Sequence, residues 1–309
     1  MYIGIDIGGT KCAVIQSDES MNITGKIKMD TGNVNDTLER IFSAVESFGD
    51  CDAIGVSCGG PLDEGRGIIC SPPNLPGWDD IHITEMLRER FKVPAFLRND
   101  ANACALAEWQ FGAGVGTRNM VFLTFGTGMG AGLILNGALY GGTNGNAGEV
   151  GHMRMERFGP TGYGKMGSFE GFCSGGGMAQ LGKTLAERYL QTGGKLPYKT
   201  EEITAKLLAE QARNGDKVAL ETFRITGEKL GEAAAVMIDM LNPEAIVIGS
   251  IFARCEDLLR EHAERVIRDE ALSQSASVCR LLPAKLGEKI GDIAALAVAV
   301  EGLRNEKLH

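Results

Sequence analysis

The chain opens with the stretch Gly4-Ile5-Asp6-Ile7-Gly8-Gly9-Thr10-Lys11, in which an apolar strand leads to a carboxylate, two glycines, a hydroxyl and an amine. Glycines in a turn between two strands let backbone N–H groups approach a ligand closely, which suits phosphate oxygens. Asp6 can hold a hydrated Mg²⁺ beside such a phosphate, because Mg²⁺ prefers oxygen ligands and keeps several of its waters. A plain β-turn that closes a hairpin is the alternative, and this stretch alone does not exclude it.

A second turn of the same kind occurs further along the chain. It reads Thr124-Phe125-Gly126-Thr127-Gly128-Met129-Gly130-Ala131-Gly132 and lies between the apolar runs 120–123 and 133–135. Two such turns resemble the arrangement by which actin-like ATPases clamp a nucleotide between duplicated halves. Neither turn is a Walker A loop, which needs Gly-Lys-Ser/Thr at the start of a helix, and neither is a GxGxxG dinucleotide fingerprint.

Composition and charge place the chain among soluble globular proteins. Its 309 residues suit two domains, and its 44% hydrophobic and 23% charged residues are ordinary. The net charge of −9, without a basic block, argues against a nucleic-acid partner. No apolar run has membrane-spanning length, and the first strand leaves no room for a signal peptide, so we expect a cytoplasmic protein with no membrane partner.

The eight cysteines also favour a reducing compartment. None belongs to a Cys-x-x-Cys pair, and several lie in apolar surroundings such as Val56-Ser57-Cys58. This pattern favours buried free thiols over disulfides or a metal cage.

The order of predicted elements in the first half is β-β-β-α-β-α-β-α, as in one ribonuclease-H-like half of an actin-type protein. Apolar runs and periodicity predict strands at 2–7, 12–16, 23–30, 53–58 and 93–97, and helices at about 36–48 (capped by Asn35 or Asp36), 83–91 and 101–111. The segment 112–119 holds three glycines and is a predicted hinge.

The second half restarts with a hairpin at 120–140 and a glycine-rich irregular stretch at 141–177. Beyond these we predict helices near 178–191, 201–213, 216–240, 255–270 and 292–304, and strands at 245–248 and 277–283. The last helix is apolar nearly all round and should pack inside, back on the first lobe. The expected division is a small α/β lobe, 1–115, completed by the C-terminal helix 291–309, and a large α/β lobe, 116–290.

Two groups of polar residues are candidates for the chemistry. Asn99 and Asp100 follow a predicted strand just as a helix begins, where a carboxylate that points into a cleft is well placed as a general base. The alternative is that one of them simply caps the helix. Glu149, His152 and Glu170 lie in the glycine-rich stretch, and their donors and acceptors suit a polyhydroxylated ring. Taken singly, a histidine such as His152 is more often a hydrogen-bonded structural residue than a substrate contact.

Taken together, the motifs resemble the ROK family (repressor, open reading frame, kinase) over nearly the whole chain. They are 6–11, Gly59-Gly60-Pro61-Leu62-Asp63, Asn74-Leu75-Pro76-Gly77-Trp78, Asn99-Asp100-Ala101-Asn102-Ala103, 124–132, 148–152, 241–249 and 291–295. The resemblance implies an actin-like ATPase fold with two lobes around a nucleotide and sugar cleft, use of ATP and Mg²⁺, a homodimer, and phosphate transfer to a hexose or N-acetylhexosamine.

The resemblance also assigns roles to residues. Asp100 resembles the catalytic base that takes the proton of the sugar's primary hydroxyl. The implied substrate-binding set is Gly60, Asn99, Asp100, Glu149, His152 and Glu170. The implied nucleotide- and phosphate-binding set is Asp6, Gly8, Gly9, Thr10, Lys11, Gly126, Thr127, Gly128, Gly249 and Ser250, with Asp6 holding Mg²⁺ through water.

The chain departs from the family at its zinc motif, Cys-x-Cys-Gly-x-x-Gly-Cys-x-Glu. The aligned stretch, 161–170, keeps the glycines and Glu170, but Thr161, Tyr163 and Ser168 stand in place of the three cysteines. His152 would be the one remaining ligand, and one imidazole cannot hold a structural Zn²⁺. We therefore predict no zinc, and expect packing of Phe158, Tyr163 and Phe169 to hold the loop.

Two other functions are open within the family. Its sugar-responsive repressors carry a DNA-binding helix-turn-helix ahead of the first phosphate motif, and the strand at residue 2 leaves no room for one. A non-catalytic sugar-binding relative, acting as a sensor or regulator, is the other alternative, against which the intact Asp100 and both phosphate turns count. Glucose, N-acetylglucosamine, N-acetylmannosamine, fructose, allose and a β-glucoside all remain open as substrates.

Overall fold

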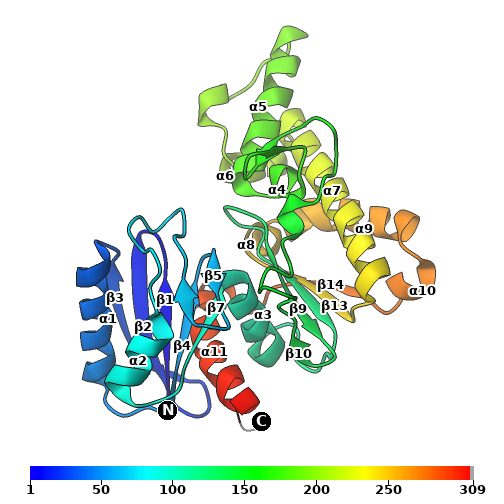
Figure 1. The fold of residues 1–309 in the computed structure, drawn as a ribbon. Helices are drawn as coiled ribbons and strands as arrows, with labels where there is room; N and C mark the ends of the chain where they lie inside the picture. Colours follow the sequence, from blue (N-terminus) through cyan, green and yellow to red (C-terminus); the bar gives the residue numbers. More distant parts are fainter. Residues whose placement is uncertain (307–309) are drawn as a thin grey trace.

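The computed structural model describes residues 1–306 as an α/β protein with two large sheets (Figure 1). The first half of the chain contains β1 (Tyr2–Ile7), β2 (Lys11–Ser17), β3 (Ile23–Asp30), α1 (Val34–Phe48), β4 (Ala53–Cys58), β5 (Leu62–Asp63), β6 (Ile68–Ile69), α2 (Ile83–Phe91), β7 (Ala95–Asn99) and α3 (Asp100–Phe111). The second half contains β8 (Met120–Leu123), β9 (Ala131–Leu135), β10 (Ala138–Leu139), β11 (Thr161–Gly162), β12 (Lys165–Met166), α4 (Phe169–Phe172), α5 (Gly175–Gln191), α6 (Ala205–Arg213), α7 (Lys217–Leu241), β13 (Ala245–Ile248), α8 (Ser250–Arg254), α9 (Glu256–Glu270), α10 (Ser273–Ala276), β14 (Arg280–Pro283) and α11 (Ile290–Glu306).

The two large sheets repeat one topology. The first has the strand order β3-β2-β1-β4-β7 and the second β10-β9-β8-β13-β14. In each, the central strand pairs antiparallel with the next strand in the chain and parallel with a strand reached by a crossover. The duplicated sheets are the expected actin-like ATPase fold, and that prediction is confirmed.

Strand register gathers the sequence motifs at one edge of each sheet. Ile7 of β1 lies level with Cys58 of β4, and Cys58 lies level with Asn99 of β7. Leu123 of β8 likewise lies level with Ile248 of β13. The carboxyl ends of parallel strands meet at the same edge, so the loops that follow these strands become neighbours.

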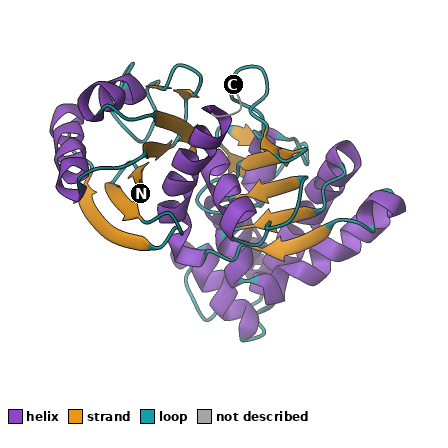
Figure 2. Ribbon diagram, turned by 90° about the horizontal axis from the view of Figure 1, so that it is seen from below, coloured by secondary structure: helices purple, strands orange, loops and turns teal. Residues whose placement is uncertain are grey.

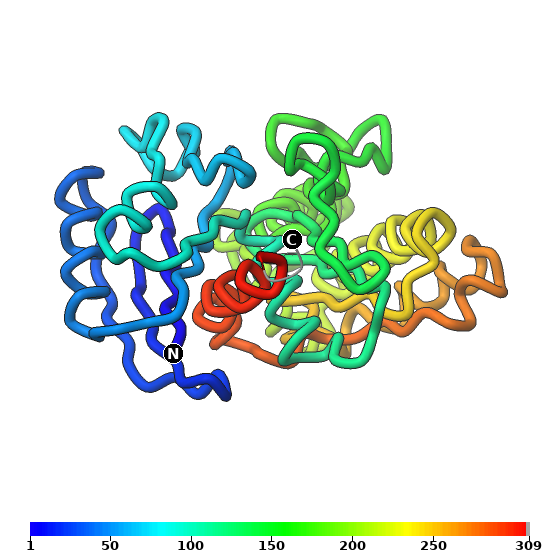
Figure 3. Tube along the Cα trace, turned by 60° about the horizontal axis from the view of Figure 1, so that its bottom comes forward, coloured from blue at the N-terminus to red at the C-terminus, as the bar shows by residue number. Residues whose placement is uncertain are grey.

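Two helices, α3 and α11, form a layer between the sheets. Figures 1 and 3 show α11, at the red end of the chain, between the two lobes, and Figure 2 shows the helices between the two sets of strands. Buried residues of α3, α11 and both sheets share one apolar core. Helix α11 approaches β4 so closely that a Cβ on Gly55 would lie 2.2 Å from the carbonyl oxygen of Ala295. Only glycine fits at that position.

Several element boundaries differ from those expected. Helix α1 begins at Val34 and is capped by Asn33, and not by Asn35 or Asp36. Strand β7 begins at Ala95, two residues later than predicted, after a proline that has no N–H for the ladder. The last helix runs from Ile290 to Glu306, and the rest of the predicted helix 291–309, residues 307–309, lies outside the described residues. The division into lobes at 115/116 stays a prediction.

Two further features concern the chain as a whole. All eight cysteines are free thiols, and Cys12, Cys58, Cys173 and Cys255 are buried. Among residues 1–306, no helix combines the length and apolar character needed to cross a membrane.

Candidate active site

The first glycine turn connects β1 to β2 and is fixed by several hydrogen bonds. The N–H of Gly8 donates to the carbonyl of Lys11 at 3.1 Å, and the Thr31 hydroxyl donates to the carbonyl of Gly8 at 2.7 Å. A Cβ on Gly9 would lie 2.5 Å from the carbonyl oxygen of Asn74, so the loop that carries Asn74 supports the turn from behind. Thr10 and Lys11 stay exposed at its tip.

Asp6 lies at the end of β1 in an acidic environment. Burial, and then the charges of Asp292 and Asp100, raise its pKa from 3.8 to about 6. Asp292 lies in the first turn of α11 and pairs with Lys26, and Gly291 beside it would place a Cβ 3.2 Å from Asp6 Oδ2. This crowding of carboxylates suits a cation. No group of three or more His, Cys, Asp or Glu among residues 1–306 is arranged to hold a metal, so a Mg²⁺ at Asp6 would need water and phosphate oxygens as its other ligands.

The second glycine turn connects β8 to β9 and has its own fixed shape. The N–H of Thr124 donates to the carbonyl of Gly130, and the N–H of Gly130 donates to the Thr124 hydroxyl, each at 3.0 Å. Gly126 faces Ser250 at the start of α8, where a Cβ on Gly126 would lie 3.5 Å from Ser250 Oγ. The predicted residues 126–128, Gly249 and Ser250 are therefore brought together.

A second element also reaches this turn, and the sequence analysis missed it. The N–H of Gly175, the first residue of α5, donates to the carbonyl of Gly126 at 2.9 Å. Ser174 caps α5 by accepting from the N–H of Gly177. A serine followed by three glycines is a recognisable helix start, but its position beside the turn could be learned only from the tertiary structure.

The sequence left open whether Asn99 or Asp100 caps the helix, and the structure gives the capping role to Asn99. Asn99 is the N-cap of α3, and its side chain accepts from the N–H of Ala101 at 3.0 Å. Asp100 Oδ1 accepts from the same N–H at 2.8 Å. Gly60 lies beside Asn99, since a Cβ there would be 3.4 Å from Asn99 Nδ2. The capping interpretation is therefore right for Asn99, while Asp100 has a second carboxyl oxygen outside this contact.

The Asp100 carboxyl is exposed but crowded by protein. Its desolvation raises its pKa, the N–H of Ala101 acts in the opposite direction, and the negative charge of Glu149 raises it further. Asp100 also contributes to the raised pKa of Asp6. Asp100 therefore lies within electrostatic reach of both Asp6 in the first half of the chain and Glu149 in the second.

Glu64, in the β5–β6 hairpin, is a second residue that the sequence analysis missed. Its Oε1 accepts from the backbone N–H of Asn99 at 2.8 Å and from Asn102 Nδ2 at 3.1 Å. Arg98 lies 3.8 Å from its other oxygen and pairs with Glu301 of α11 at 3.1 Å. Glu64 directly follows the Gly59–Asp63 motif, but nothing in that motif indicates its partners.

Among the remaining predicted sugar residues, Glu170 lies against the second glycine turn. Glu170, in the first turn of α4, accepts from the N–H of Met129 at 3.0 Å. Gly151 fits so tightly that a Cβ would lie 2.2 Å from the Met129 carbonyl oxygen and 3.4 Å from the Glu170 Cβ. His152 stacks edge-on against Tyr163 with ring centroids 5.4 Å apart.

The surface of residues 1–306 includes two hollows of several hundred Å³. One, of about 570 Å³, is lined on one side by the β5–β6 hairpin and Arg98, and on the other by the segment 139–145. Glu64 of this lining accepts a hydrogen bond from the N–H of Asn99. The other, of about 640 Å³, lies over α8 and α9 and is lined by none of the predicted site residues. The first hollow is likewise lined by none of the predicted site residues, but Glu64 in its lining is hydrogen-bonded to Asn99 and Asn102 and so connects it to the start of α3.

The segment that aligns with the zinc motif does not fit a zinc ion. Ser168 is buried and caps α4 by accepting from Gly171 N–H, and Tyr163 is 72% exposed. Hydroxyls held in this way are not the thiolates that zinc requires. The expected packing is right for Phe169, which is fully buried, and wrong for Tyr163 and for Phe158, which is 76% exposed. Both rings lie on the loop's outer side, where no core covers them.

Two sheets of one topology, each with a glycine turn at its carboxyl edge, define the class as the actin-like ATPase fold. The ROK family model matches residues 2–301, and the chain belongs to the ROK family.

Its relatives include enzymes and regulators. A glucokinase of Thermotoga maritima is 31% identical over 310 residues, covering 97% of each chain. The crystal structure of a ROK family glucokinase from Streptomyces griseus, in complex with glucose and AMPPNP, superposes with a TM-score of 0.76 at 30% identity, covering 97% of this chain and 99% of that one. The Escherichia coli DNA-binding transcriptional dual regulator NagC is 32% identical over 71% of this chain and 53% of its own.

Proposed function

We propose that this protein is an ATP-dependent sugar kinase that transfers the γ-phosphate to the primary hydroxyl of a hexose or N-acetylhexosamine. The observation that carries the proposal is the position of Asp100, at the start of α3, within electrostatic reach of Asp6 and of Glu149. A base there can reach a hydroxyl held by one half of the chain while a phosphate is held at the glycine turns. Phosphoryl transfer depends mostly on such positioning and on charge neutralisation.

In this proposal Asp100 accepts the proton of the attacking hydroxyl. Its raised pKa makes it a stronger base than an ordinary aspartate. Asn99, Glu149, His152 and Glu170 bind the sugar hydroxyls, and Gly60 leaves room for the ring beside Asn99. Because Glu170 is bonded to the turn at Met129, the sugar and phosphate positions are fixed relative to each other.

The nucleotide phosphates lie against residues 8–11 and 126–128, with Gly249 and Ser250 near the adenosine. The donor set at Asp6 fits Mg²⁺, which when bound neutralises phosphate charge. We further propose a homodimer that works in the cytoplasm. The names of the glucokinase relatives make glucose the first sugar to test.

A sensor that binds sugar without phosphorylating it is the second candidate, and the similarity to NagC favours it. The intact Asp100 and the two intact glycine turns favour the kinase. The two functions make opposite predictions for turnover, so one experiment separates them.

The experiment measures ADP release with Mg²⁺ and ATP over a panel of hexoses, N-acetylhexosamines and glucosides. For the kinase, one sugar stimulates turnover, and Asp100→Asn lowers kcat by about 10²-fold or more while sugar binding by calorimetry stays within a few-fold. Asp269→Asn, an equal charge change on the exposed face of α9, serves as the control. Near-normal turnover in Asp100→Asn would refute the assigned base, and sugar binding without turnover in the unmodified protein would favour the sensor.

A further inference from the structure

The segment 153–168 joins His152 to α4, which carries Glu170, and therefore sets the distance between two proposed sugar-binding residues. We propose that Lys229 of α7 is the positioning residue that holds the Glu156 end of this segment against α7, in the role that a metal ion would fill if the cysteines were present. This inference rests on the proposed function for its kinetic consequences, but not for its structural ones.

Hydrogen bonds within the segment give it a defined shape. The N–H groups of Met155 and Glu156 both donate to the carbonyl of Gly167, at 2.9 and 3.0 Å. The N–H of Gly167 donates to Pro160 at 2.9 Å, and the N–H of Phe169 donates to Met153 at 2.8 Å. These bonds close the segment on itself. Gln180 of α5 attaches one end of it, by accepting from the N–H of Thr161 at 3.0 Å and donating to the Thr161 carbonyl at 2.9 Å.

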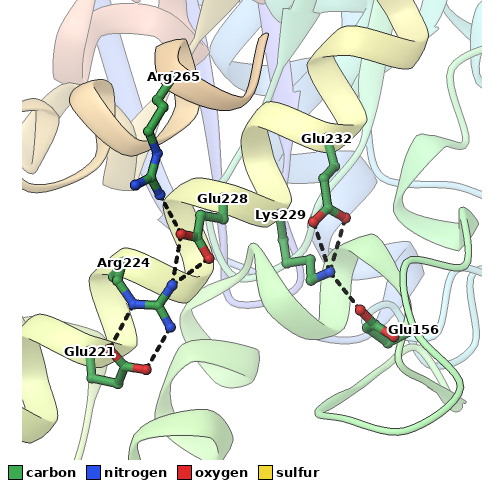
Figure 4. Close-up of polar contacts among 7 residues, drawn as sticks. All are labelled: Glu156, Glu221, Arg224, Glu228, Lys229, Glu232 and Arg265. Atoms are coloured by element: carbon green, nitrogen blue, oxygen red, sulfur yellow. Dashed lines mark hydrogen bonds and ion pairs between the residues drawn. The ribbon is translucent and has the colours of Figure 1, made fainter. Parts of the chain in front are cut away.

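Lys229 supplies a second fixed point outside the segment, at Glu156. Its ammonium donates to Glu156 at 2.7 Å and to both oxygens of Glu232, one turn further along α7, at 2.9 Å (Figure 4). The Lys229 side chain is only 13% exposed. One cation thus joins two carboxylates that are far apart in the sequence, which is how a bound metal ion stabilises a loop.

The charges of this cluster support each other. Burial acts to lower the pKa of Lys229, but its bonds to Glu156 and Glu232 outweigh burial and raise it. The bond to Lys229 lowers the pKa of Glu156. The pair is therefore fully ionised at neutral pH, and truncating Lys229 would leave Glu156 without this cationic partner.

The same cation lies beside the helix that carries Glu170. Its nitrogen is 5.8 Å from the centre of the Phe172 ring in α4, and a Cβ on Gly159 of the segment would lie 2.6 Å from that ring. The Thr226 hydroxyl of α7 also donates to the carbonyl of Phe172 at 3.3 Å. Lys229 therefore contacts the segment through Glu156 and contacts α4 through Phe172, and both contacts bear on where Glu170 points.

The first test compares Lys229→Met with Arg224→Met. Arg224 is a cation of the same helix, but its ion pairs are with Glu221 and Glu228 of α7 and do not reach the segment (Figure 4). We expect Lys229→Met to raise KM for the sugar about tenfold, with KM for ATP within twofold, because a charge-assisted bond is lost on the sugar side alone. Lys229→Arg should restore most of the affinity. Equal sugar KM in Lys229→Met and Arg224→Met would overturn the proposal.

A second readout needs no kinase activity. Hydrogen exchange of residues 153–168 should be several-fold faster in Lys229→Met and in Glu156→Gln than in Arg224→Met, and the double variant Lys229→Met/Glu156→Gln should be no faster than either single one. Glu156 is exposed, so Glu156→Gln tests the contact without risk to folding. If the protein phosphorylates no sugar, this result still decides the inference. Unchanged exchange, or stoichiometric zinc in the purified protein, would overturn it.

Discussion

Among single residues, Asp6 is placed where its ionised carboxylate lowers the stability of the folded protein. It is a carboxylate kept among protein atoms and near two other carboxylates, Asp100 and Asp292, and its pKa is raised to about 6. The folded protein therefore holds a proton on Asp6 at pH values where the unfolded chain has lost it. The stability linked to this group is complete below the ordinary pKa of 3.8 and is lost as the pH rises through about 6.

We predict that Asp6→Asn is more stable than the unmodified protein when Mg²⁺ is absent. The neutral amide avoids the cost of an ionised carboxylate there, so the gain at pH 7.5 is on the order of 2 kcal/mol. The gain should shrink as the pH is lowered toward 4, and kinase activity should be lost. Urea unfolding from pH 4 to 7.5 measures this. A gain that does not depend on pH would show that the charge of Asp6 is not its source.

Glu64 is predicted to hold the start of α3. Replacing it by Gln keeps one acceptor but removes the charge opposite Arg98, and replacing it by Ala also removes the acceptor for Asn99 N–H. We expect Glu64→Ala to lower kcat more than tenfold, and Glu64→Gln to retain most of the activity, because the backbone bond can persist. Steady-state kinetics of both variants, with Asp63→Asn as a neighbouring control, provide the check. Equal losses in Glu64→Gln and Glu64→Ala would contradict a role through that bond.

Among the secondary-structure elements, α11 can pack closely on the first sheet because glycines on β1 and β4 carry no side chain. It is apolar nearly all round, as its sequence indicated, because it packs on the first sheet on one side and on α3 on the other. Small residues on β1 and β4 let its backbone come close: a Cβ on Gly4 would lie 2.8 Å from the N–H nitrogen of Leu296. Backbone atoms, unlike flexible side chains, cannot move away without shifting the whole helix.

We predict that Gly55→Ala is destabilised by about 2–3 kcal/mol, because the added methyl group meets the Ala295 carbonyl and forces α11 away from β4. The matched control is Gly176→Ala in α5, where no atom lies within 4 Å of the new Cβ. That change should be neutral or stabilising by up to about 1 kcal/mol, because alanine favours helix. Chemical unfolding measures both, and equal stabilities would mean that α11 adjusts at no cost.

At the scale of the whole molecule, the proposed ligands contact both halves of the chain. The sugar set takes Gly60 and Asn99 from the first half and Glu149 and Glu170 from the second, and the phosphate set is divided in the same way. A ligand bound this way draws the halves together, which completes the site and excludes water.

We therefore predict positive coupling between the two ligands. The sugar Kd should fall several-fold when Mg²⁺ and a non-hydrolysable ATP analogue are present, because the first ligand meets part of the cost of closure for the second. Calorimetry gives the affinities, and solution scattering should show a smaller radius of gyration with both ligands than with neither. Mannitol, an open-chain polyol, is the control. Independent binding with unchanged dimensions would contradict closure.

Most of the fold and much of the candidate site followed from the sequence. The apolar strands, their order and the polar residues after their carboxyl ends predicted the duplicated sheets. Strand register then explains why Asp6, Gly60 and Asn99 come together, because parallel strands place their ends at one edge. The glycine turns and the catalytic candidate Asp100 were predicted because each is a local pattern whose chemistry is carried by adjacent residues.

Only the tertiary structure revealed the residues that support this site. Glu64, Lys229 and Gly175 act through partners that lie far from them in the sequence, and no local spacing indicates such a contact. The packing expected of Phe158 and Tyr163 was wrong for the same reason: a ring is buried only where another element covers it. Local sequence sets the chemistry and the strands, whereas long-range packing decides which charged groups hold them in place.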